Sequence, residues 1–167
     1  MLGKTVFVTV GTTKFDDLVN TVLNRAVLEA LSARDYRRLI LQTGNSSIEP
    51  DCSARCGFHS IESFKLSPSI GKYMRSADLV ISHAGAGSVL EALENGKHLI
   101  VVINDLLMDN HQVELAEQLH KDEHLYYCTC PDLSRTVQTM DLTKLKPFVN
   151  NKSVNIANFI DKIMGFR

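Results

Sequence analysis

The stretch VISHAGAGSVLEALENGKHLIVVIND, residues 80–105, contains two apolar runs that are separated by a glycine-rich turn and a helical pattern. The runs at 78–82 and 98–103 are almost continuously apolar, which is typical of parallel strands that are buried on both faces. Residues 87–95, between these runs, predict a helix. A strand, a helix and a second strand in this order predict one unit of a parallel α/β sheet.

Strands and helices alternate through most of the remaining sequence. Further strands are predicted at 4–10, 38–43, 58–64 and 125–128. Further helices are predicted from 16 to 31, at 67–77, at 109–121 and from about 132. Residues 45–57 are rich in turn-forming residues and predict a surface loop.

Two of these helices have recognisable start signals. Thr13 with Asp16 resembles a capping box at the start of the first helix, which has a wide apolar face from Leu18 to Leu31. Pro68 suits the first turn of the helix at 67–77.

The elements divide the chain into two regions. Residues 1–142 are predicted to form one Rossmann-like domain, a doubly wound parallel sheet with helices on both faces. Residues 143–167 are predicted to form a tail that ends in a short helix. The apolar face of that helix either packs back onto the domain or docks onto another chain, and it consists of Ile156, Phe159, Ile160, Ile163 and Met164.

Composition excludes several classes of protein. The chain has 167 residues, of which 44% are hydrophobic and 22% charged, as expected for one globular domain. Its formal net charge of −1 and the lack of a basic stripe argue against a nucleic-acid partner. No apolar run is long enough to span a membrane, and the first residues lack the pattern of a signal peptide. We therefore expect a cytoplasmic protein.

The four cysteines form the pairs Cys52/Cys56 and Cys128/Cys130. Neither pair has the C-x-x-C spacing that is usual in zinc sites, although looser spacings and disulfides stay open. Free cysteine packs as a small apolar residue, so we expect reduced thiols. We also expect the protein to use no metal and no cofactor.

The turn that follows the strand at 78–82 is the strongest candidate site. Gly85, Ala86 and Gly87 allow a ligand to approach the backbone closely, and the helix that follows offers unpaired amides and the positive end of its dipole. Ser88 adds a hydroxyl and His83 a ring N–H. These groups suit a diphosphate. The alternative is that the small residues serve only close packing.

Glu91 lies one helical turn beyond Ser88, a rise of about 5.4 Å. This step is similar to the distance from a diphosphate to the hydroxyls of a ribose, which a carboxylate can accept. Glu91 could instead be merely solvated. The interpretation as a ribose contact makes the ligand a nucleotide diphosphate.

The combined pattern H-x-G-x-x-S-x-x-E in HAGAGSVLE, residues 83–91, resembles the nucleotide-sugar signature of glycosyltransferases with the two-domain GT-B architecture. The resemblance implies that His83 and Ser88 contact the diphosphate and that Glu91 holds the ribose. Ala86 and Gly87 replace a bulky Trp and an Asn of the plant signature, so contacts from those side chains are lost.

Further stretches narrow the resemblance to glycosyltransferase family 28 and its two-subunit eukaryotic UDP-N-acetylglucosamine transferases, which are related to the donor-binding half of MurG. They are FVTVGTTKFDDL, RLILQTG, NHQVELAEQLHK and LYYCTC, and the resemblance extends from about residue 4 to 165. It implies transfer of GlcNAc from UDP-GlcNAc to dolichyl-diphosphate-GlcNAc, with a β1,4 bond and inversion. It also implies recruitment to the cytosolic face of the endoplasmic reticulum.

Two more segments enter the candidate site through the same resemblance. Gly11, Thr12 and Thr13 follow the first strand, and their amides could point at an anion, although a tight turn would look identical. Asn110, His111 and Gln112 begin the helix after the strand at 98–103. The resemblance places His111 and Gln112 near the donor sugar and ribose, with Asn110 as a looser candidate. Helix capping is the alternative for Asn110, and surface exposure for the other two.

The sequence contains the residues of only one half of a GT-B enzyme. The resemblance therefore implies a membrane-anchored partner that binds the lipid-linked acceptor sugar, and a chain that is inactive alone. The general base stays unassigned. A sugar-nucleotide-binding regulatory module without catalysis is the alternative. A small NAD-dependent reductase fits poorly, because the first turn is GTT rather than G-x-G-x-x-G and no Tyr-x-x-x-Lys pair is present.

Overall fold

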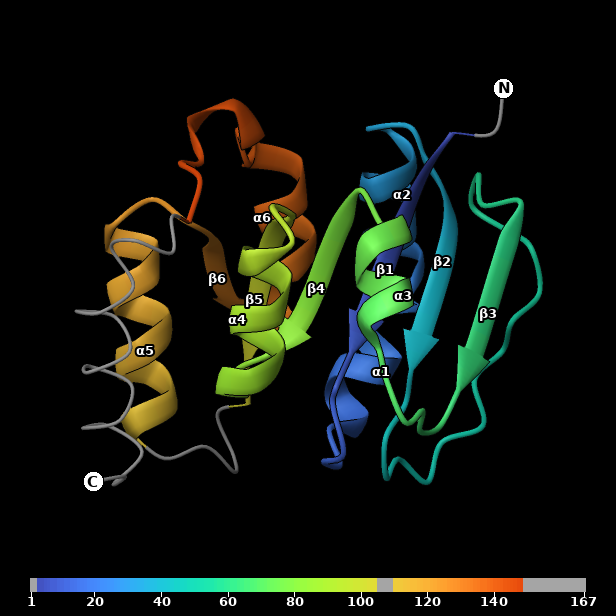
Figure 1. Ribbon diagram of the computed structural model, residues 1–167. Helices are drawn as coiled ribbons and strands as arrows, with labels where there is room; N and C mark the ends of the chain where they lie inside the picture. Colours follow the sequence, from blue (N-terminus) through green and yellow to red (C-terminus); the bar gives the residue numbers. More distant parts are fainter. Residues whose placement is uncertain (1–2, 105–109, 149–167) are drawn as a thin grey trace.

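The computed structural model describes residues 3–104 and 110–148, with the backbone alone at 110–112. These residues form a parallel sheet with the strand order β3-β2-β1-β4-β5-β6 (Figure 1). The strands are β1 Lys4–Thr9, β2 Tyr36–Gln42, β3 Ser60–Phe64, β4 Leu79–His83, β5 His98–Ile103 and β6 Tyr126–Thr129. All five strand pairs are parallel. The predicted doubly wound sheet is confirmed.

Helices cover both faces of the sheet. One face packs against α1 Asp16–Val22, α2 Arg25–Ser32 and α6 Leu133–Thr139. The other packs against α3 Gly71–Ser76, α4 Ala86–Glu94 and α5 Asn110–Lys121, which lie in front of the sheet in Figure 1. Two 3₁₀ turns, η1 Cys130–Asp132 and η2 Leu142–Lys144, flank α6. The six strands lie within two residues of their predicted bounds.

Successive side chains of each strand point into alternate cores, as the pleat requires. In β1, Val6 and Val8 pack with α1, α2 and α6, whereas Phe7 packs with α3 to α5. All three side chains are fully buried. Burial of such a side chain contributes about 1.5–3 kcal/mol, so the central strands are strongly held. The rigid sheet then fixes where the loops at its carboxyl edge lie.

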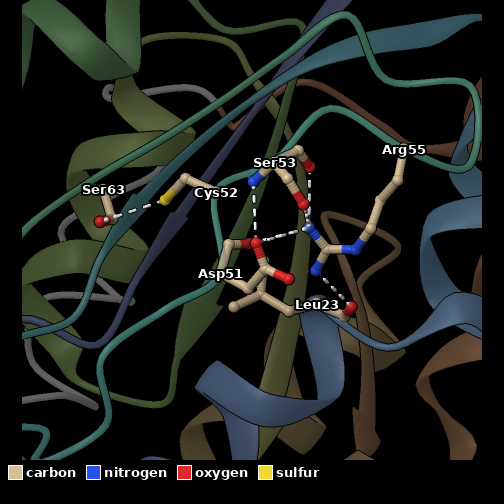
Figure 2. A network of polar contacts seen from close by, with 6 residues as sticks. All are labelled: Leu23, Asp51, Cys52, Ser53, Arg55 and Ser63. Carbon is tan, nitrogen blue, oxygen red and sulfur yellow. Dashed lines mark hydrogen bonds and ion pairs between the residues drawn. The ribbon is translucent and has the colours of Figure 1, made fainter.

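The single helix predicted for residues 16–31 is wrong, because the chain breaks it into α1 and α2. Asn24 caps α2 by accepting a hydrogen bond from the amide of Val27 at 2.8 Å. Arg55, from the 45–57 loop, donates to the carbonyl of Leu23 at 3.1 Å and to that of Asp51 at 2.8 Å (Figure 2). A distant guanidinium therefore satisfies a carbonyl at the end of α1, and the helix stops there.

The two predicted start signals are also wrong. Asp16 does not cap α1 together with Thr13, because its carboxylate accepts from Ser46 at 2.6 Å, and the Thr13 hydroxyl donates to the carbonyl of Val10. The bond from Ser46 is the main cause that lowers the pKa of Asp16. Pro68 precedes α3 by three residues instead of lying in its first turn. At the start of α1, a contact with the loop after β2 therefore replaces the predicted local capping box.

The described start of the predicted tail lies against the domain. Lys146 forms an ion pair with Glu123 at 2.9 Å, and Phe148 packs edge-on against His124 with ring centroids 5.5 Å apart. The predicted helix with Ile156 to Met164 lies outside the described residues. Within 3–104 and 110–148, no helix combines the length and the apolar character that crossing a membrane requires.

Candidate functional site

The site lies where the strand order reverses, between the carboxyl ends of β1 and β4. Loops that leave two neighbouring strands in opposite directions open a crevice at such a point. Here the crevice is a cavity of about 490 Å³, a size typical of small-molecule sites. Its lining consists of Gly11, Thr12, Thr13, Gln42, Ser67, Pro68, Ser69, Ile70, His83, Gly85, Gly87, Ser88 and Glu91.

The start of α4 forms one wall of this cavity. Gly85 is the N-cap residue, and no side chain caps the helix. The first intrahelical bond runs from the amide of Val89 to the carbonyl of Gly85 at 3.0 Å, so the amides of Ala86, Gly87 and Ser88 have no helical acceptor. A Cβ at Gly87 would meet no atom within 4 Å. This helix end therefore offers space and unpaired donors for an anion.

His83 is held between the two turns. A Cβ at Gly11 would lie 2.7 Å from its Nε2, and a Cβ at Gly85 would overlap its Cε1. Burial lowers the pKa of His83 to about 4, so the ring is neutral at physiological pH. Within the described residues its nitrogens have no hydrogen-bond partner. A neutral imidazole can still donate one N–H to a ligand.

The turn after β1 differs from the expectation that its amides point at an anion. The amide of Gly11 donates to Thr9 Oγ1 at 2.9 Å, and that of Thr13 donates to the carbonyl of Val10 at 3.2 Å. Asn45, from the loop after β2, binds the carbonyls of Thr12 and Thr13 at 3.0 Å each. Within the described part of the chain, only the Thr12 amide of this turn lacks an acceptor.

Ser88 and Glu91 face the same cavity, one helical turn apart. Among the described residues neither side chain has a hydrogen-bond or ion-pair partner. A Cβ at Gly71 would lie 3.3 Å from Glu91 Oε2, so the carboxylate lies against the first turn of α3. A half-buried carboxylate without a protein partner is available to accept from ligand hydroxyls.

The structure thus brings together eight of the twelve predicted site residues, which are Gly11, Thr12, Thr13, His83, Gly85, Gly87, Ser88 and Glu91. Ala86 does not line the cavity and packs toward the core under α3 to α5. Asn110, His111 and Gln112 begin α5 as predicted, but their side chains lie outside the described residues.

Sequence reasoning missed two parts of the lining. The segment 67–70, which follows β3, lines the cavity, and so does Gln42 at the end of β2. The local signal was weak in both cases, since Gln42 is the last residue of β2 and residues 67–70 begin three residues beyond the end of β3. Placing Gln42 and residues 67–70 in the site would have required knowledge of the strand order, because β2 and β3 could have lain elsewhere in the sheet.

The cysteines do not join the site. None of the four forms a disulfide, in line with the expected reduced thiols, and burial raises the pKa of the Cys128 thiol to about 11. Among residues 3–104 and 110–148, no group of three or more His, Cys, Asp or Glu side chains could hold a metal ion.

Known proteins share both the sequence and the fold. The human UDP-N-acetylglucosamine transferase subunit ALG13 is 52% identical over 127 residues, which are 76% of this chain and 11% of the human protein. The chain thus spans about a tenth of that relative. The solution structure of an ALG13 covers 97% of this chain and 98% of its own, with a TM-score of 0.72 and 28% identity.

A bacterial structure shares the fold at lower identity. MurG of Acinetobacter baumannii superposes with a TM-score of 0.65 and 19% identity, over 86% of this chain and 43% of MurG. The sheet is therefore one half of a GT-B architecture. Residues 5–164 match the glycosyltransferase family 28 C-terminal domain, and the chain belongs to that family.

Proposed function

We propose that the cavity between β1 and β4 binds UDP-GlcNAc. One observation carries this proposal: the uncapped start of α4, the neutral ring of His83 and the unpaired side chains of Ser88 and Glu91 surround a single cavity of about 490 Å³. The diphosphate lies at the α4 amides with His83 and Ser88, and the ribose lies at Glu91. The names of the relatives, UDP-N-acetylglucosamine transferase subunits, support this choice of donor.

The proposed reaction transfers GlcNAc to dolichyl-diphosphate-GlcNAc. The acceptor 4-hydroxyl attacks C1 of the donor sugar, the bond from C1 to the β-phosphate oxygen breaks, and UDP leaves with inversion at C1. Negative charge develops on the β-phosphate as this bond breaks. The α4 amides and the His83 N–H stabilise that charge, because they are already oriented in a site that excludes part of the solvent.

A base must remove the proton of the attacking hydroxyl. Among the described residues that line the cavity, Glu91 is the only carboxylate, and it is assigned to the ribose. We therefore propose that a membrane-anchored partner supplies the acceptor half and completes the active site, and that the chain alone is inactive. The partner recruits the chain to the cytosolic face of the endoplasmic reticulum, where the lipid-linked acceptor lies. The predicted apolar helix of the tail, outside the described residues, is the proposed docking element.

Glu91→Ala tests the function directly. We expect transfer by the reconstituted complex to fall on the order of tenfold to a hundredfold, because two bonds from ribose hydroxyls to a carboxylate are lost. Wild-type enzyme should also discriminate against a 2′-deoxy donor, and the variant should not. Glu94→Ala is the matched control, since Glu94 is exposed on the same helix and does not line the cavity.

The same experiment separates catalysis from regulation. Both variants must still assemble with the partner, which a pull-down measures. Transfer that is unchanged in Glu91→Ala, with normal assembly, would favour the regulatory module over the enzyme.

A further inference from the structure

A row of polar side chains lies at the carboxyl edge of three adjacent strands, and one of its members, Gln42, lines the cavity. Thr9 of β1 is in register with Gln42 of β2 and with Ser82 of β4. All three are at least 97% buried, in a sheet whose other inward residues are mostly apolar. A buried polar group costs free energy unless it forms hydrogen bonds, so each of them needs a partner.

Hydrogen bonds account for two of these three residues. The Ser82 hydroxyl donates to the carbonyl of His83 at 2.7 Å. Thr9 Oγ1 accepts from the Gly11 amide at 2.9 Å and donates its proton to Gln42 Oε1. Since the Thr9 hydroxyl is the donor, the oxygen of the Gln42 carboxamide faces Thr9. The NH₂ group of Gln42 therefore faces the other way.

That NH₂ group is the unmatched donor of the row. Within the described residues it has no acceptor. No fully buried side-chain nitrogen or oxygen of the described residues lacks a partner, so the Gln42 nitrogen must be reached by solvent. Gln42 is only 3% exposed and it lines the cavity, so that access comes through the cavity.

We infer that Gln42 is a further ligand-binding residue, whose carboxamide N–H₂ donates to an acceptor oxygen of the bound nucleotide while its Oε1 holds the turn after β1 through Thr9. The inference rests on the proposed nucleotide site. It gives one side chain two functions, because the group that positions Gly11 beside His83 also contacts the ligand.

Gln42→Glu tests this inference with almost no change in shape. The carboxylate still accepts from Thr9, so the turn keeps its anchor, but the donor becomes a charged acceptor. We expect the affinity of the full chain for UDP to fall at least about tenfold in calorimetry or an NMR titration. The reason is that the new carboxylate oxygen would face the ligand oxygen that accepts from the NH₂ group in the wild type. Gln138→Glu, exposed on α6, adds the same charge outside the cavity and should bind as wild type does.

Gln42→Met removes the NH₂ donor without adding charge, and it also removes the oxygen that accepts from Thr9, so Thr9→Val, which removes that hydrogen bond but keeps the NH₂ donor, is its matched control. Gln42→Met should weaken UDP binding about fivefold while circular dichroism stays that of the wild type. The side-chain amide resonances of Gln42 in the wild type should also shift on saturation with UDP. UDP affinity equal to that of the wild type in both folded Gln42 variants, or unmoved Gln42 resonances at saturation, would overturn the inference.

Uridine as a second ligand identifies the acceptor. If Gln42→Glu weakens binding of UDP but not of uridine, the Gln42 NH₂ group donates to the diphosphate. If it weakens both equally, the NH₂ group donates to the nucleoside. A wild-type chain that binds neither ligand contradicts the proposed function itself. Binding by the wild type with no loss in the variants contradicts only the inference about Gln42.

Discussion

The turns after β1 and after β4 both contain glycines, both lead from a buried strand toward a helix and both contact His83, yet they are built in opposite ways. The turn at Gly11 to Thr13 uses most of its donors internally and is clamped by Asn45. The turn at Gly85 to Ser88 leaves its amides unpaired at an uncapped helix start. The first is a closed wall of the cavity, and the second is an open turn with unpaired donors.

The glycines of the two turns show the same division. Gly11 has a φ of +62°, which is strained for other residues, and a side chain there would collide with His83. Gly87 lies within α4 and has no neighbour within 4 Å of a Cβ. The fold therefore requires glycine at Gly11, whereas at Gly87 it leaves room for a side chain.

The largest expected effect is on stability, and it contrasts the two glycines directly. Gly11→Ala should lower the free energy of unfolding by about 3 kcal/mol, through the left-handed backbone and the clash with His83. Gly87→Ala should raise it by about 0.5–1 kcal/mol, because alanine is a better helix former. Urea unfolding followed by circular dichroism measures both. Equal effects would remove the distinction between wall and open site.

A charge at the open turn should separate binding from folding. Gly87→Asp places a carboxylate in the first turn of α4, where it favours the helix dipole but repels a phosphate. We expect UDP affinity to fall on the order of a hundredfold with no loss of stability, as measured by calorimetry and by urea unfolding. Gln138→Asp controls for the added charge. Unchanged UDP affinity in Gly87→Asp would mean that the diphosphate does not lie at α4.

The third effect concerns His83, which both turns contact. Burial lowers its pKa from 6.5 to about 4 in the folded chain, whereas the unfolded chain keeps the ordinary value. Between these values the unfolded chain binds more protons, so stability must fall as the pH falls. From pH 7 to pH 5 the loss from this residue should be about 2 kcal/mol.

The matching measurement is urea unfolding at both pH values for the wild type and His83→Gln. The variant removes this titration, so its stability should depend less on pH over the same interval. An identical dependence in the two proteins would show that the ring is not buried between the turns as a neutral group.

Sequence and structure agree where the signal is local. The strands at 98–103 and 78–82 were predictable because each is a continuous apolar run. That His83, Ser88 and Glu91 line one cavity was predictable because they lie on one short segment. The break between α1 and α2 was not, since Arg55, some thirty residues away, binds the carbonyl of Leu23. The supposed capping box failed for the same reason, because Ser46 bonds to Asp16.

By itself, the sequence determined the alternation of strands and helices, the family and the strongest part of the candidate site, because periodicity and short motifs are properties of neighbouring residues. Only the tertiary structure decided that β2 and β3 lie beside β1, and hence that Gln42 and residues 67–70 line the cavity. It also decided which glycine turn is closed and which is open. These features depend on hydrogen bonds and steric contacts between segments that are distant in the sequence, so no local sequence pattern predicts them.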